Sequence, residues 1–517
     1  MDLVIKLVML IIFFGVMIGI GLYCRKHATD VNGFVLGGRS VGPWLTAFAY
    51  GTSYFSAVVF VGYAGQFGWK YGIAATWAGL GNAFLGSLLA WAVLGRRTRI
   101  MTQHLDSATM PQFFGERFES KPLKLAASAI IFIFLIPYTA SLYNGLSRLF
   151  GMAFDIDYSV CVIVMAVLTG IYVIAGGYMA TAINDFIQGI IMIFGIVAVV
   201  AAVLNGQGGF LAALDKLAAV SDESVSAAPG VFNSFFGPDP VGLLGVVILT
   251  SLGTWGLPQM VQKFYAIKSE SAINKGMIIS TVFAAIVAGG CYFLGGFGRL
   301  FSDRIDIAAN GYDSVIPTML SGLPAILIAV VVILVLSASM STLSSLVLAS
   351  SSTLTLDFIK GNIIKDMDEK RQVRWMRGLV VVFIAISVVL ALIQYKSSVT
   401  FIAQLMGVSW GALAGAFLAP FLYGLYWKRT TKAACWVSFV FSTVFMLAVI
   451  SPVKGSLPAL LQSPINAGAF CMIVGLAVVP VVSLFTKAPD RKRLEDVFSC
   501  YERKVTVTVR DSIGEQE

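Results

Sequence analysis

Thirteen apolar runs divide this chain, and each is long enough to cross the hydrocarbon core of a bilayer, which takes about 20 residues of α-helix. Hydrophobic residues make up 58% of the chain and charged residues only 12%, whereas soluble domains carry about 25% charged residues. Because the bilayer core offers no water to backbone groups, such runs fold as helices. The sequence therefore predicts an all-α polytopic membrane protein with about 13 transmembrane helices. The expected spans lie near residues 3–23, 43–66, 72–94, 125–148, 158–178, 185–204, 241–262, 275–298, 322–349, 378–395, 400–426, 434–452 and 466–486.

The lysine and arginine residues are unevenly divided between the connections on the two sides of the bilayer. Thirteen spans place the termini on opposite sides, and with the N-terminus outside, 28 of the 36 Lys and Arg residues fall on the inner side. This distribution follows the positive-inside rule. We therefore expect a plasma (inner) membrane protein with an external N-terminus and a cytoplasmic C-terminus. The same rule accounts for the net charge of +9 without nucleic acid as a partner.

Two of the expected spans contain residues that break helices. The second contains Gly51, and the seventh contains Gly253, Gly256 and Pro258, which weaken or end a helix. Transporters built from inverted repeats place discontinuous helices at corresponding positions in their two halves, and these breaks lie five spans apart. The spacing predicts a leucine-transporter-like fold with an inverted five-helix repeat. The expected boundaries are 1–490 for the transmembrane domain, about 43–205 and 240–426 for its repeat halves, and 491–517 for a cytoplasmic tail.

Hydroxyl side chains are concentrated in the ninth expected span. Residues 337–353 hold ten Ser and Thr residues in 17 positions, although hydrocarbon cannot solvate hydroxyl groups. Oxygen atoms gathered on one helix face suit a small hard cation. The alternative is packing between helices, with each hydroxyl bonded back to its own helix. Four of the hydroxyls stand at offsets 0, +1, +3 and +4, which bring them to one face: Ser341, Thr342, Ser344 and Ser345.

Asp185 is the only carboxylate expected at or within the membrane edge of a core span. A carboxylate beside two or three hydroxyls makes an anionic oxygen site suited to Na⁺. Alternatively, Asp185 caps the start of the sixth span by accepting backbone N–H bonds. The sequence leaves both roles open.

Aromatic residues lie near the two breaks. Such residues line many ligand pockets, and they also serve as core packing or as anchors at the membrane interface. The residues concerned are Tyr54, Phe55, Tyr138 and Trp255.

Motifs of nucleotide-driven pumps and of common enzymes are absent from the sequence. The glycine-rich stretch at 36–43 lacks the GxxxxGK[ST] pattern that holds nucleotide phosphates. Both histidines, His27 and His104, fall in expected loops, and the six cysteines form no CxxC pair. We therefore expect no enzyme activity and no cofactor.

Several short motifs accompany the breaks and the hydroxyl cluster: Gly37-Gly38-Arg39-Ser40, residues 110–118, Ala175-Gly176-Gly177-Tyr178 followed by residues 185–188, and residues 256–259 followed by Gln262-Lys263-Phe264. Together they make the chain resemble the sodium:solute symporter family over about residues 1–485, and most of all its sodium/proline branch. The resemblance implies a secondary active symporter that imports a small organic solute with Na⁺ by alternating access. An amino acid such as proline is the first expectation for the solute.

The resemblance also implies which residues bind sodium and solute. The common sodium site of the family would use three backbone carbonyls and two hydroxyls, those of Thr52, Phe55, Ala338, Ser341 and Thr342. A second sodium site, present in part of the family, would use Asp185, Ser344 and Ser345. The corresponding solute-binding positions are Tyr54, Tyr138, Thr254 and Trp255.

The chain departs from its relatives at several solute-binding positions. Tyr54 stands where sodium/proline symporters carry an Asp, and Thr250 and Thr254 stand where they have aromatic residues. Sialic acid transporters place an Arg in span 4, and residues 134–141 of this chain contain none. A monocarboxylate, a pantothenate-like compound and a sugar are therefore alternative solutes, and a cation channel or leak pathway is an alternative function. The expected partners are Na⁺, the solute and the lipid bilayer, with no nucleic acid and no obligate protein partner.

Overall fold

A computed structural model describes residues 2–154, 157–226, 229–360, 362–364, 366–397 and 402–502, which form helices and connecting turns without a β-strand. The long helices are α1 (Asp2–Cys24), α8 (Lys121–Phe154), α9 (Tyr158–Gly206), α13 (Ser271–Gly295), α16 (Ala325–Thr353), α17 (Glu369–Ser397), α18 (Ile402–Tyr426), α19 (Lys432–Ile450) and α20 (Pro464–Phe485). The segments around the two breaks are α3 (Pro43–Tyr54), η3 (Val58–Tyr63), α4 (Ala64–Tyr71), η4 (Gly72–Ala75), α5 (Thr76–Ala83), η5 (Phe84–Leu89), η6 (Trp91–Gly95), α6 (Arg96–His104), α11 (Pro240–Gly256) and α12 (Pro258–Ala266). Shorter helices are α2 (Val31–Leu36), α7 (Met110–Arg117), α10 (Phe210–Ala219), α14 (Ile307–Asn310), α15 (Val315–Leu320) and α21 (Arg491–Ser499).

The number of membrane crossings agrees with the sequence prediction. Ten helical segments of the described chain are long and apolar enough to cross a membrane, or eleven when the pair α11 and α12, bent by 46°, counts as one span. Two of these segments, Val58–His104 and Tyr158–Gly206, have 47 and 49 residues, about twice the length of one crossing. Each contains a glycine with positive φ, Gly72 at +61° and Gly177 at +54°. Counting each as two crossings gives thirteen, the number expected from the sequence.

The sixth span begins earlier than predicted. We expected separate spans at 158–178 and 185–204, but helix α9 runs through both and is interrupted only at Gly177. The polar pair Asn184-Asp185 interrupts the hydropathy pattern without ending the helix, because both side chains are buried in the protein interior. Asp185 therefore lies about two turns beyond Gly177, inside a helix. The alternative in which Asp185 caps the start of a helix is wrong.

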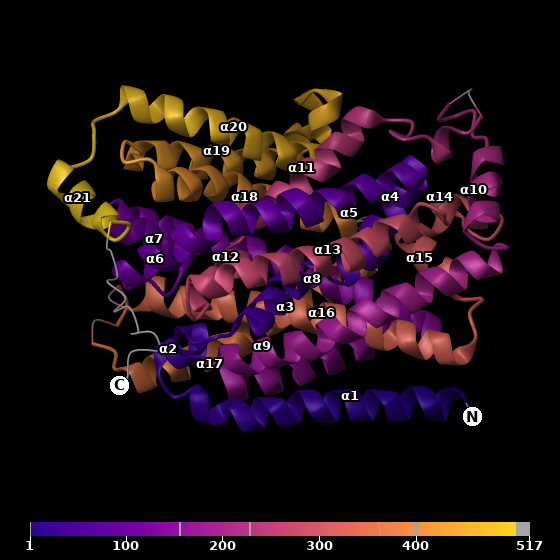
Figure 1. Cartoon of the computed structure of the whole chain (residues 1–517), viewed down its shortest axis with the longest axis horizontal. Helices are drawn as coiled ribbons and strands as arrows, with labels where there is room; N and C mark the ends of the chain where they lie inside the picture. The colour runs from indigo at the N-terminus through magenta and orange to yellow at the C-terminus, as the bar shows by residue number, and fades with distance from the viewer. Residues whose placement is uncertain are drawn as a thin grey trace, which may run out of the picture.

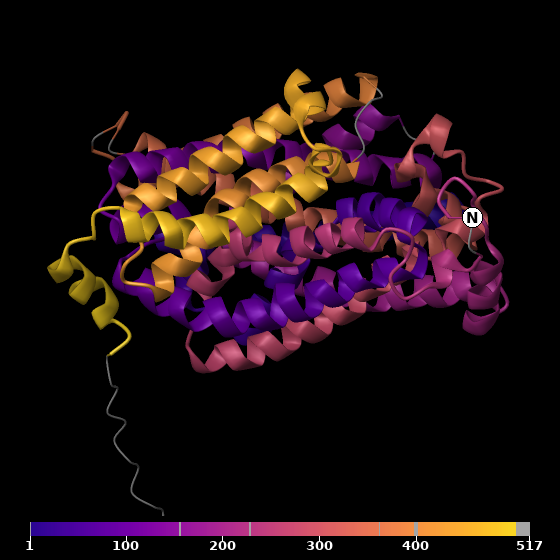
Figure 2. The same ribbon diagram turned by 90° about the horizontal axis from the view of Figure 1, so that it is seen from above.

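The helices run along the long axis of the molecule and form an inner and an outer set (Figures 1 and 2). The membrane-crossing segments of α16 and α18 are 78% and 89% buried, whereas that of α1 is 22% buried and those of α17, α19 and α20 are each 39% buried. The outer helices therefore present apolar side chains to lipid. The hydroxyl-rich span α16 lies inside, where neighbouring helices can satisfy its polar groups.

The two ends of the bundle carry different short helices. Helix α1 begins at the end where α10 and α14 lie, whereas α7 and α21 lie at the opposite end (Figure 1). We refer to these as the α10 end and the α21 end. An odd number of crossings requires this separation between the beginning and the end of the chain. The predicted tail 491–517 begins with α21, and its residues 503–517 lie outside the described residues.

Substitution of Gly177 by alanine should destabilise the protein. Gly177 has φ +54° and ψ −146°, a conformation that side chains resist by roughly 1–3 kcal/mol. An added Cβ would also lie 2.8 Å from the carbonyl oxygen of Phe34. We expect Gly177→Ala to lower the midpoint of thermal unfolding of the purified protein in detergent.

Gly15→Ala is the matched control, because a Cβ at Gly15 meets nothing within 4 Å and the residue lies within helix α1. Equal unfolding midpoints for the two variants would show that the break at Gly177 needs no glycine.

Candidate ion and solute site

Two hydroxyl side chains of α16 reach the break in the second span. Thr342 Oγ1 lies 3.1 Å from each of the carbonyl oxygens of Thr52, Phe55 and Ala338. Ser341 Oγ lies 3.2 Å from the carbonyl oxygen of Thr52 and 3.0 Å from that of Ala338. All five residues are at most 1% exposed. The structure thus brings together, in one buried cluster, the five oxygen atoms predicted for the first sodium site.

The backbone at the break explains why two of these carbonyls are available. Helix α3 ends at Tyr54, and Phe55 has an extended backbone with φ −81° and ψ 118°. The last carbonyls of a helix have no partner within it, and the dry interior supplies none. Hydroxyls from α16 donate to them instead. Carbonyl and hydroxyl oxygens are also the ligands that hard cations prefer, so the cluster fits Na⁺, whose binding here stays a prediction.

The residues predicted for a second sodium site lie one turn further along α16. Ser345 Oγ is 3.0 Å from Ser53 Oγ, while Ser344 Oγ donates to the carbonyl of Ser341 at 2.9 Å, as in the packing alternative. Asp185 is fully buried, and neither of its carboxylate oxygens has a hydrogen-bond partner among the described residues. A buried carboxyl group without hydrogen bonds stays ionised only beside a positive charge, and otherwise takes up a proton.

That positive charge comes from Lys263 of α12. Lys263 Nζ lies 3.9 Å from Asp185 Oδ2 and donates to Ser345 Oγ at 3.1 Å. The seventh expected span, 241–262, left Lys263 just outside the membrane, which is wrong, because α12 continues to Ala266 and the residue is 1% exposed. A lysine within an apolar span was itself a signal of function, and the sequence reasoning missed it.

Two of the four predicted solute residues, Tyr54 and Tyr138, are buried. Both side chains are at most 2% exposed. The hydroxyl of Tyr54 has no hydrogen-bond partner within the described chain. Tyr138 packs edge-on against Trp410, with ring centroids 6.0 Å apart. Trp410, on α18, was not predicted, since no break or motif marks it in the sequence.

The other two predicted solute residues face the third span. Thr254 Oγ1 donates to the carbonyl of Gly86 at 2.9 Å, and Trp255 Nε1 donates to that of Leu85 at 2.9 Å. Tyr50 of α3 also donates to the carbonyl of Gly86, at 2.8 Å. These bonds connect the broken helices to η5, and they give Thr254 and Trp255 a structural role. A contact between either residue and the solute stays a prediction.

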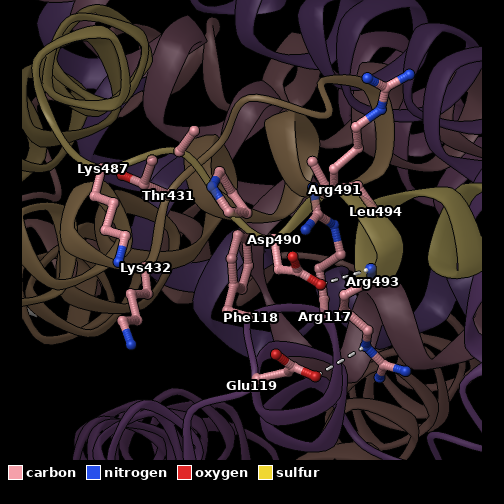
Figure 3. Close-up of a pocket in the computed structure, with 12 residues that line it drawn as sticks. Arg117, Phe118, Glu119, Thr431, Lys432, Lys487, Asp490, Arg491, Arg493 and Leu494 are labelled. Atoms are coloured by element: carbon pink, nitrogen blue, oxygen red, sulfur yellow. Dashed lines mark hydrogen bonds and ion pairs between the residues drawn. The ribbon is translucent and has the colours of Figure 1, made fainter.

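A separate cavity of about 530 Å³ opens at the α21 end, between α7, α19 and the chain that leads into α21 (Figure 3). Its lining shares no residue with the predicted sodium and solute sites. Arg493 contacts Glu119 across it at 3.5 Å. The basic residues of the lining are Arg117, Lys432, Lys487, Arg491 and Arg493.

Known proteins are similar to this chain over nearly its whole length. The model of the sodium:solute symporter family matches residues 34–440. Sodium/proline symporters of Staphylococcus aureus strains JH9 and Mu3 are 31% identical to it over 498 residues, 93% of each protein. One solved structure, the substrate-bound outward-open state of a Na⁺-coupled sialic acid symporter, is similar with a TM-score of 0.72 and 16% identity, over 94% of this chain and 99% of that one. This likeness confirms the predicted fold class.

The free hydroxyl of Tyr54 gives a prediction about stability. Tyr50→Phe removes the hydrogen bond to Gly86 and should lower the free energy of unfolding by about 1 kcal/mol. Tyr54→Phe removes a hydroxyl without a partner in the described structure and should cause no loss. Thermal unfolding of both variants in the same detergent measures the difference, and an equal loss in both would contradict the assignment.

Proposed function

Because this chain belongs to the sodium:solute symporter family, its function is sodium-coupled solute symport, and we propose that the solute is a small amino acid such as proline. The family consists of transporters and not of enzymes. The coupling ion in this proposal is a sodium ion bound between the break in the second span and α16.

One observation carries the ion assignment. Thr342 and Ser341 place their hydroxyl oxygens within 3.0–3.2 Å of three carbonyl oxygens, and two of those carbonyls belong to residues at the end of a discontinuous helix. Discontinuous helices supply backbone carbonyls to sodium ions in transporters with inverted repeats. The cluster contains oxygen only and is shielded from water, which favours a hard cation.

The proposed position of the ion gives a mechanism by which sodium couples to solute. A sodium ion in the cluster joins α3 to α16, because its ligands come from both. A ligand shifts a conformational equilibrium only through its different affinities for the two states. If sodium and solute both favour the state with α3 held against α16, each increases the affinity for the other. Sodium entry then drives uptake, with roughly 2.3 kcal/mol per charge per 100 mV added to the concentration gradient.

Three features support an amino acid as the solute. The relatives at 31% identity are named sodium/proline symporters. The break after Tyr54 is followed by the start of η3, where Ser56 accepts from Val58 N and from Phe60 N; the remaining N–H groups of this helix start suit a carboxylate. The buried rings of Tyr54, Tyr138 and Trp410 offer an apolar surface to a small hydrocarbon side chain.

The chain is a multi-pass membrane protein, and its orientation and repeat boundaries are proposals. The excess of Lys and Arg in connections at one side supports a cytoplasmic α21 end. The halves 43–205 and 240–426 each begin with a broken helix, α3 in one and α11 in the other, which supports an inverted repeat.

Uptake measurements test the proposed function. In proteoliposomes that contain the purified protein, an inward sodium gradient should drive accumulation of labelled proline, whereas potassium or lithium gradients should drive less. Excess unlabelled proline should compete, and glucose, lactate, pantothenate and sialic acid should not. Sodium-independent proline uptake would contradict coupling, and competition by one of the other solutes in place of proline would overturn the proposed substrate.

Loss of either hydroxyl should weaken sodium binding at the first site. Ser341→Ala and Thr342→Ala each remove one ligand of the ion, and a hydrogen-bond partner of a charged group contributes about 1.5–3 kcal/mol. We therefore expect the sodium concentration for half-maximal uptake to rise roughly 10- to 100-fold in each variant.

Ser350→Ala is the control, since Ser350 lies buried on the same helix and its hydroxyl has no partner among the described residues. If Ser341→Ala and Thr342→Ala behave like Ser350→Ala, sodium binds elsewhere.

A further inference from the structure

Lys263 places a positive charge among the ligands predicted for a second sodium ion. Its Nζ donates to Ser345 Oγ at 3.1 Å and lies 3.9 Å from Asp185 Oδ2. The ammonium also lies 5.0 Å from the centre of the Tyr178 ring, a distance at which aromatic rings attract cations. The Lys263 side chain is 2% exposed and that of Asp185 is 0% exposed. The ammonium therefore contacts oxygen atoms and a ring, with little access to solvent.

Asp185 has no other source of positive charge within the described structure. Its only ion pair there is with Lys263. The other buried cations are engaged at different places: Arg99 with the carbonyl of Ile267, Arg117 with that of Gly424, and Arg299 with Asp222. A buried carboxylate without a paired charge is strongly unfavourable, so Lys263 stabilises the ionised form of Asp185.

An ammonium group and a sodium ion would use the same oxygen atoms at this site. Both are monovalent cations that take the oxygen atoms of Asp185 and Ser345 as partners. If both were present, two positive charges would share a single carboxylate in an environment where like charges repel strongly. Electrostatic repulsion therefore favours one cation at a time.

We propose that Lys263 is a tethered cation that occupies the second sodium site, so that this chain couples one sodium ion to each solute. The inference rests on the proposed function, in which the first site binds the coupling sodium. It assigns the residues Asp185 and Ser345 to Lys263 and leaves Ser341 and Thr342 to the transported ion.

The tethered charge also connects three separate elements. Lys263 belongs to α12, Asp185 to α9 and Ser345 to α16. Ser345 further contacts Ser53 at 3.0 Å, and Ser53 follows Thr52, a predicted ligand of the first site. The ammonium therefore supports the α3–α16 contact one helical turn beyond the place where sodium is proposed to bind. Unlike a sodium ion, it does so without entering or leaving the protein.

Counting bound sodium ions tests the proposal without requiring transport. Equilibrium binding of radioactive sodium to the purified protein should give one ion per wild-type chain. Lys263→Met retains much of the side-chain length without the charge, so Asp185 and Ser345 become available and the count should rise to two. Adding Asp185→Asn to Lys263→Met should return the count to one, and Lys263→Arg, which keeps the charge, should also give one.

The two proposals fail in different ways. In a chain with Ser341→Ala and Thr342→Ala, the count should fall to zero with Lys263 present and be one with Lys263→Met. If the doubly substituted chain still binds one sodium ion, the first site is refuted. The additional ion bound after Lys263→Met would still test the second site.

Two sodium ions bound to the wild-type chain would contradict the proposal that Lys263 occupies the second site. This test uses the wild-type chain alone, so it remains valid even if the Lys263→Met variant fails to fold. The same count for wild type and a folded Lys263→Met variant would also overturn it. In proteoliposomes, the ratio of sodium to solute flux should likewise rise from one in the wild type to two in Lys263→Met.

Discussion

Where α3 ends, carbonyl groups have no partners within the helix, and they lie in the buried interior of the protein. The packing of the helices around the break depends on how these groups are satisfied. The hydroxyls of Ser341 and Thr342 approach them at 3.1–3.2 Å. For that, α16 has to lie directly against the break, which places it among the most buried spans of the described chain. A helix of alternating aliphatic residues in this position would leave the break unsatisfied. The hydroxyl-rich composition of the ninth span and the discontinuity of the second are thus two parts of one arrangement.

Much of this arrangement could be predicted from the sequence, since lipid imposes strong rules on composition. Span length and hydropathy predicted thirteen crossings, and the glycine and proline residues marked both breaks. The offsets of Ser341 and Thr342 predicted a common face, and the resemblance to a family named their carbonyl partners. The boundary between the fifth and sixth spans could not be predicted, because Asn184 and Asp185 are as polar as a loop. Only the packing around them shows that they lie inside a helix.

The parts that sequence could not give depend on contacts between residues far apart in the chain. Lys263 is separated from Asp185 by 78 positions, and nothing in local composition shows that they form a pair. The seventh expected span ended one residue before Lys263, whereas the structure continues the helix past it. In the same way, Trp410 meets Tyr138 only through the packing of α18 on α8. Thr254 and Trp255 have hydrogen-bond partners in η5 that no spacing rule shows.

The contrast in burial between α1 and α18 has a consequence for biogenesis. Helix α1 is apolar and mostly exposed to lipid, and Gly21 packs it closely against Tyr172 of α9, a helix made much later in synthesis. Its apolar surface therefore suits it to lie in the bilayer before α9 has been made. Helix α18 differs from α1 in both properties, since it is less apolar and its membrane-crossing segment is 89% buried. It packs against α8, α11, α19 and α20. Two of these neighbours are translated before it and two after it, so its buried surface is complete only once α19 and α20 have been made.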